Sequence, residues 1–99
     1  MKKLSKQLAL RIEELNALIV ARQDDFITTY AGTTHPYIVN VAPLEISPSG
    51  QFVKVKPSGI VGSPYAYQQS IERYNMNDKE SLGDFRYTLN TLLRAYRAA

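Results

Sequence analysis

Residues 77–97, NDKESLGDFRYTLNTLLRAYR, contain the clearest structural signal in the chain. Apolar side chains recur there every three or four residues, the spacing that places them on one face of an α-helix. These residues are Leu82, Phe85, Leu89, Leu92, Leu93 and Tyr96. Asn77 followed by Glu80 resembles a capping box at the start of such a helix. Arg94 and Arg97 lie near its end, where the helix dipole favours cations, so we predict a helix with one buried face.

A second helical pattern covers residues 3–30. Its main apolar residues follow the same spacing and are Leu4, Leu8, Ile12, Leu15, Ile19, Phe26 and Tyr30. Two arrangements fit this pattern. One is a single helix of roughly 40 Å, at 1.5 Å per residue. The other is a break near Gln23, after which Asp24 caps a second, shorter helix. Ala31 and Gly32 end the helical segment in either case.

Alternation of apolar and polar residues replaces the helical spacing between residues 36 and 61. It occurs in residues 37–41, 44–46 and 53–56. The sequence Ser47-Pro48-Ser49-Gly50 is a strong turn signal between the last two segments. We predict a short antiparallel sheet of two or three strands, packed on the helices because an isolated hairpin is only marginally stable in water.

Ser63 and Pro64 form a typical helix start, with serine as the cap and proline in the first turn. Tyr67, Ile71 and Tyr74 follow at helical spacing, and residues 75–78 form a connecting turn. The predicted class is therefore α+β, with a long N-terminal helix, a short antiparallel two- or three-stranded sheet and two C-terminal helices. The chain has 99 residues with no repeat or linker, so we predict a single compact domain over residues 1–99.

The composition argues against an enzyme. The chain has no cysteine and one histidine, His35, and it contains neither a Walker sequence nor a nucleophile elbow. We expect no catalytic residues, no metal site and no cofactor. No apolar run approaches the roughly 18 residues that span a bilayer, so we expect no membrane contact. We expect a cytoplasmic protein, in the host cytoplasm if the chain is viral.

Basic residues form the first candidate binding site, because the net charge is +3. Arginines recur at helical spacing in residues 86–97, and two lysines lie on the outer side of the predicted strand at residues 53–56. If these surfaces adjoin, they bind nucleic acid or an acidic partner through Lys54, Lys56, Arg86, Arg94 and Arg97. Tyrosines near the glycine loop at residues 59–62 would add stacking surfaces, and the loop itself is a weak anion-binding signal. The alternative is that these charges are only the solvent face of their elements.

The broad apolar face of the N-terminal segment is the second candidate. A second copy of the chain or a different protein would bind it through Leu4, Leu8, Ile12, Leu15 and Ile19. The alternative is that the C-terminal helices cover this face. The sequence therefore favours a non-enzymatic protein-interaction module, a small accessory, regulatory or inhibitory protein of bacterial or phage type. A nucleic-acid-binding protein that uses the basic stripe and the sheet is the alternative hypothesis.

Overall fold

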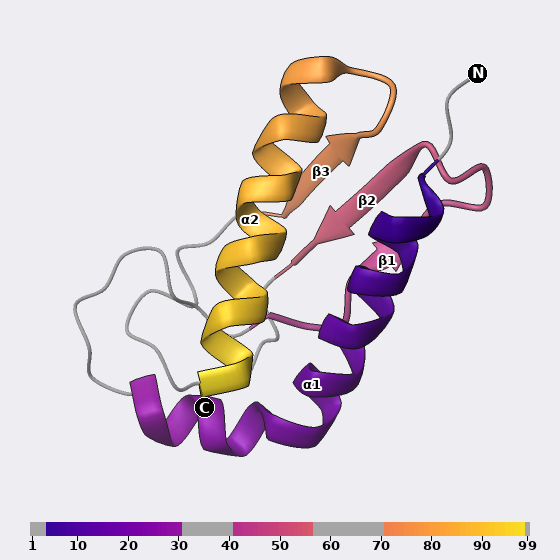
Figure 1. Cartoon of the computed structure of the whole chain (residues 1–99). Coiled ribbons are helices and arrows are strands. Elements are labelled where there is room, and N and C mark those ends of the chain that lie inside the picture. Colours follow the sequence, from indigo (N-terminus) through magenta and orange to yellow (C-terminus); the bar gives the residue numbers. More distant parts are fainter. Residues whose placement is uncertain (1–3, 31–40, 57–70, 99) are drawn as a thin grey trace.

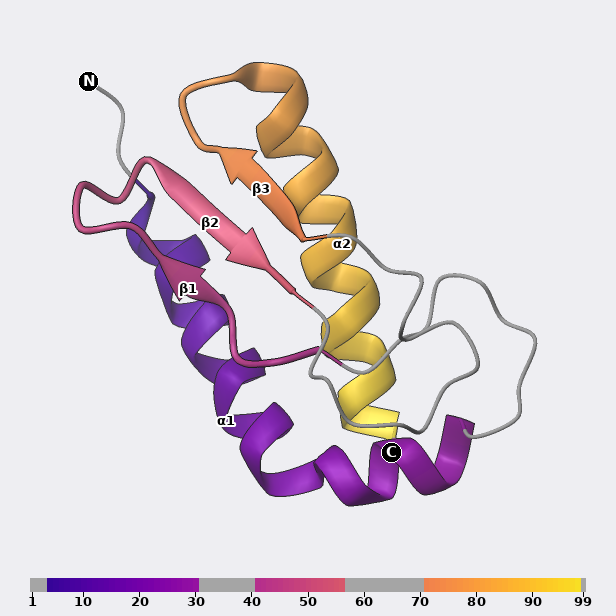
Figure 2. The same ribbon diagram turned by 180° about the vertical axis from the view of Figure 1, so that it is seen from behind.

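The computed structural model describes residues 4–30, 41–56 and 71–98, which form two helices and one antiparallel sheet (Figure 1). The elements in chain order are α1 (Lys6–Tyr30), β1 (Glu45–Ile46), β2 (Phe52–Val55), β3 (Glu72–Asn75) and α2 (Lys79–Ala98). The strands lie side by side in the order β1-β2-β3. Both helices lie on the same face of the sheet (Figures 1 and 2). The predicted α+β class is confirmed.

The hairpin between β1 and β2 forms at the predicted turn. Glu45 lies opposite Lys54, and Ile46 lies opposite Val53. Gly50 has a φ of 76°, a left-handed conformation that glycine adopts without steric cost, and its amide donates to the Ser47 carbonyl at 2.9 Å. The turn residues therefore fix the register that places Val53 and Lys54 on opposite faces of the sheet.

The third strand corrects the prediction. We expected the region that includes Tyr74 to be helical, but the structure has β3 there, paired with β2. Tyr74 lies opposite Val53, and its ring packs against Phe85 with centroids 5.4 Å apart. Tyr74 and Met76 alternate at the spacing of a strand. Pairing with β3 satisfies the backbone groups along the edge of β2, which would have no strand partner there if β3 were a helix. The described residues therefore contain two helices where three are predicted, and Ser63, Pro64 and Tyr67 of the predicted third helix lie outside those residues.

The start of α2 differs from the predicted capping box by one residue. Asp78 is the cap, because its carboxylate accepts a hydrogen bond from the Ser81 amide at 3.1 Å. The Asn77 amide instead donates to the Asn75 side chain at 2.9 Å, within the turn from β3. The predicted buried face of α2 is confirmed, with Leu82 half-buried at its margin.

Helix α1 is one uninterrupted helix, as the first of the two predicted arrangements has it, but it is bent (Figure 1). The Ser5 hydroxyl caps it by accepting from the Leu8 amide at 3.2 Å. Its second half passes across the C-terminal end of α2, where Arg22 donates to the carbonyls of Tyr96 at 3.3 Å and Arg97 at 2.7 Å. Carbonyls at a helix C-terminus have no intrahelical donor, so a guanidinium stabilises this end.

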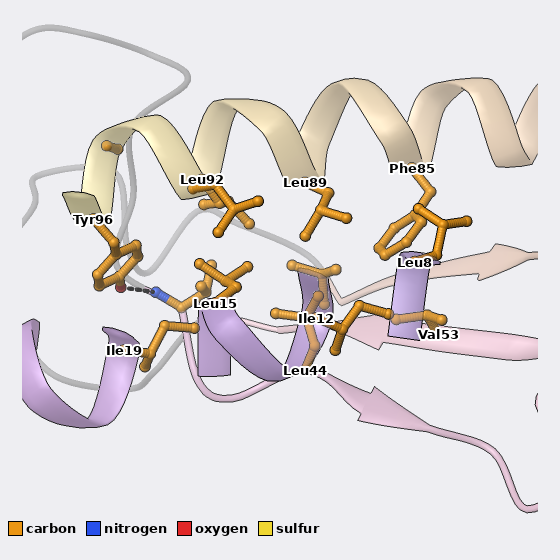
Figure 3. Packing of buried hydrophobic residues seen from close by; sticks show 14 of the residues in the cluster. Leu8, Ile12, Leu15, Ile19, Leu44, Val53, Phe85, Leu89, Leu92 and Tyr96 are labelled. Atoms are coloured by element: carbon orange, nitrogen blue, oxygen red, sulfur yellow. Dashed lines mark hydrogen bonds between the residues drawn. The ribbon is translucent and has the colours of Figure 1, made fainter. Parts of the chain in front are cut away.

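The core lies between the two helices and the inner face of the sheet (Figure 3). Its buried apolar residues are Leu8, Ile12, Leu15, Ile19, Val41, Leu44, Val53, Val55, Met76, Phe85, Leu89, Leu92, Leu93, Ala95 and Tyr96. Asn16 joins α1 to the chain before β1, because its side chain accepts from the Leu44 amide at 2.7 Å and donates to the Leu44 carbonyl at 3.1 Å. The buried backbone of Leu44 is thereby paired without a strand partner on that side.

Candidate functional site

A group of arginines from both helices surrounds an open depression of about 430 Å³ near the C-terminal end of α2. We call this the arginine surface, and its lining residues are Arg11, Asn90, Leu93, Arg94, Arg97 and Ala98. The helical spacing in α2 brings Asn90, Arg94 and Arg97 to one side of that helix. Helix α1 adds Arg11 because the two helices pack side by side on the sheet.

Two polar contacts connect the helices across this surface. The Arg11 guanidinium donates to the Asn90 side-chain carbonyl, and the Arg97 guanidinium pairs with the carboxylate of Glu14. These contacts hold two of the three guanidinium groups in defined positions. Both lie at the surface, where such pairs contribute little to stability. Their effect is to orient the donors.

Arg94 differs from its two neighbours. Within residues 4–30, 41–56 and 71–98, neither Arg94 nor Arg86 forms an ion pair or a side-chain hydrogen bond. The depression therefore has three guanidinium groups and one adjacent carboxylate, that of Glu14, which leaves two positive charges in excess. Guanidinium groups bind carboxylates and phosphates through paired hydrogen bonds, so this surface suits an anionic group.

The structure places most of the predicted α1 interface inside the chain. Leu8, Ile12, Leu15 and Ile19 are at most 5 % exposed, and they face α2 and the sheet (Figure 3). Leu4 is half-buried against the same core. The face that prompted the interface hypothesis is therefore covered within the monomer, which is the alternative weighed from the sequence. The exposed apolar side chains of α1 are others, such as Val20.

The two candidate lysines do not adjoin the arginines. Val53 and Val55 point into the core toward the helices, so Lys54 points to the opposite face of the sheet. The ammonium groups of Lys54 and Lys56 lie 4.0 and 3.4 Å from the carboxylate of Glu45 on that face. The predicted basic residues thus belong to two separate surfaces, one on the helices and one on the sheet.

Several predicted features lie outside the described residues: His35, the glycine loop at 59–62 and the tyrosines beside it. Among the residues that are described, no group of three or more His, Cys, Asp or Glu side chains could hold a metal ion. Burial raises the pKa of Tyr96, while the hydrogen bond from the Val41 amide opposes the rise. It lies in the core and not at a surface site.

Sequence reasoning missed three residues that the structure brings to these surfaces: Arg11, Phe52 and Arg73. Arg11 joins the arginine surface through Asn90, which is 79 positions away in the chain. Its own neighbourhood in the sequence shows only a polar position on an amphipathic helix. Phe52 and Arg73 adjoin on the outer face of the sheet, whereas the spacing of Tyr67, Ile71 and Tyr74 predicts a helix at Arg73.

Two further findings concern the chain as a whole. In the part of the chain that the structure describes, no helix combines the length and the apolar character that crossing a membrane requires. Comparison with known proteins finds no matching family model, no matching curated protein and no matching solved structure.

Proposed function

We propose that this protein is a non-enzymatic interaction module that binds an acidic segment of a partner protein at the arginine surface. The observation that carries the proposal is the position of Arg94. Its guanidinium has no partner among the described residues, yet it shares a depression with Arg11 and Arg97. An incoming carboxylate would meet donors that are already oriented by Asn90 and Glu14.

The surroundings of the depression favour a protein over a nucleic acid. Glu14, whose carboxylate pairs with Arg97 at this surface, is exposed. This carboxylate would repel a continuous row of phosphates, whereas a protein surface of mixed charge can complement both signs. Leu93 and Ala98 add apolar area to the lining of the depression, which suits a peptide whose acidic side chains are separated by apolar ones.

The test is a titration of the full chain with a short, fluorescently labelled oligo-glutamate peptide at low ionic strength. We expect Arg94→Ala to weaken binding about tenfold or more, because hydrogen bonds to charged groups contribute about 1.5–3 kcal/mol. The matched control is Arg86→Ala. It removes the same charge from an exposed, unpaired position of the same helix, outside the depression.

The control decides between a site and a general charge effect. If the peptide binds at the depression, Arg86→Ala changes the affinity by no more than about twofold, since exposed charges outside a contact act mainly through screened attraction. Equal losses in the two variants would refute the proposed site. If a labelled oligonucleotide competed with the peptide, and Arg94→Ala weakened the binding of that oligonucleotide, this surface would instead be assigned to nucleic acid.

A further inference from the structure

The outer face of the sheet combines an aromatic ring, an arginine and two lysines. This is the face turned away from both helices, and Figure 2 looks onto it. Lys54 lies directly opposite Arg73, and Phe52 is two residues before Lys54 on β2. Arg73 reaches diagonally over β2, so that its guanidinium carbon lies 3.8 Å from the centroid of the Phe52 ring.

The ring and the guanidinium line a recess of about 270 Å³ on this face. Its other lining residues are Glu45, Ile46, Ser47 and Lys54. A guanidinium 3.8 Å from a ring centroid is within the range of a cation–π contact. The same planar surfaces, an aromatic ring and an arginine, are those on which proteins stack unpaired nucleobases.

The charges around the recess suit the phosphates on either side of such a base. Lys54 and Lys56 lie beside it, and both are paired only with Glu45 in the described structure. The side chains of these pairs are 39–54 % exposed, so the pairs are weak and solvent-screened. A phosphate can therefore replace the Glu45 carboxylate as the partner of either lysine at little cost.

We propose that the outer face of the sheet binds single-stranded nucleic acid, with one unpaired base stacked against the Phe52–Arg73 pair. Lys54 and Lys56 then contact the adjoining phosphates. A duplex does not fit this mode, because its bases are stacked on one another and cannot enter the recess. The proposal concerns a different surface and a different class of ligand from the arginine surface on the helices.

The test measures fluorescence anisotropy of a labelled, unstructured pyrimidine oligonucleotide and of a hairpin duplex, at several salt concentrations. Phe52→Leu removes the aromatic ring, and Arg73→Lys keeps the charge but removes the planar stacking surface. We expect each to weaken single-strand binding by at least about fivefold, the factor that corresponds to the lower limit of base–aromatic stacking. Because Arg73→Lys keeps its charge, the salt dependence should remain as in the wild type.

Three further variants separate the contributions. Lys54→Ala should lower the slope of log K against log salt by about 0.7, the value for one phosphate contact of a single strand. Glu45→Gln should strengthen binding, because it removes the carboxylate that competes with phosphate. Arg94→Ala on the opposite side should leave the oligonucleotide affinity unchanged, so this proposal and the proposed function fail or succeed independently.

Two outcomes would overturn the inference. One is wild-type affinity in both Phe52→Leu and Arg73→Lys, and the other is equal binding of the duplex and the single strand. Phe52 is half-buried, so circular dichroism must first show that its variant is folded. Arg73 is exposed, and its variant keeps the test decisive if the Phe52 variant is unstable. If oligo-glutamate displaced the oligonucleotide, and Phe52→Leu and Arg73→Lys both bound the oligonucleotide as the wild type does, the face would be reassigned to acidic peptides.

Discussion

Replacement of Tyr96 by phenylalanine tests the central packing argument. The Tyr96 side chain is fully buried, and its hydroxyl accepts a hydrogen bond from the Val41 amide at 3.1 Å (Figure 3). Phenylalanine keeps the ring in the core and removes the hydroxyl that accepts from Val41. The Val41 amide, on a residue that is 3 % exposed, is then left without this partner. A buried donor that loses its partner costs about 1–3 kcal/mol, so we expect Tyr96→Phe to lower the free energy of unfolding by this amount.

Thermal and urea denaturation at neutral pH measure this loss. For a domain of this size, 1 kcal/mol corresponds to roughly 4–8 °C in Tm. The control is Tyr87→Phe, which removes the same hydroxyl from a side chain that is 72 % exposed on α2 and should change stability by less than about 0.5 kcal/mol. If the Tyr96 variant were as stable as the Tyr87 variant, the hydroxyl would not connect α2 to the segment before β1.

Tyr96 also makes the stability of the folded protein depend on pH. Burial raises the pKa of Tyr96 above the usual value for tyrosine, although the hydrogen bond from Val41 lowers it somewhat. The folded state therefore retains the phenolic proton to a higher pH than the unfolded state does. The contribution of the neutral Tyr96 side chain to the free energy of unfolding is fully present below the ordinary tyrosine pKa of about 10. It is lost as the pH rises through the higher pKa of Tyr96 in the folded state. We expect the difference between the wild type and Tyr96→Phe to shrink in this alkaline range, and a difference that grows there would contradict the assignment.

Other predictions concern the core, the connection between α1 and the sheet, and the two surfaces. Leu89→Ala should lower the free energy of unfolding by about 2–5 kcal/mol, because Leu89 is fully buried, whereas Arg94→Ala should cost under about 0.5 kcal/mol in the same urea titration. Asn16→Leu should cost at least about 2 kcal/mol and speed hydrogen exchange of the Leu44 amide, since it leaves two backbone groups of Leu44 without their partner. The oligo-glutamate peptide and the single-stranded oligonucleotide should bind at the same time, because the proposed surfaces lie on opposite sides of the molecule, and competition between them would show a shared site.

The sequence alone determined which side of several elements is buried. In α2 the repeat of Phe85, Leu89 and Leu92 at helical spacing places them on one face, and the structure buries all three. The alternation of Val53 and Val55 with Lys54 likewise predicts the two faces of β2. These features follow from local periodicity, because the repeat of a helix or a strand fixes the direction of each side chain relative to its neighbours in the chain.

Only the tertiary structure decided which segments adjoin. The residues of β3 fit a helical spacing as well as an alternating one, and pairing with β2 selects the strand. The apolar face of α1 is compatible with a partner protein or with α2, and packing within the chain selects α2. The arginines of α2 meet Arg11, while Lys54 and Lys56 point to the other side of the sheet. These outcomes depend on contacts between residues far apart in sequence, and local propensity does not contain the free energy of such contacts.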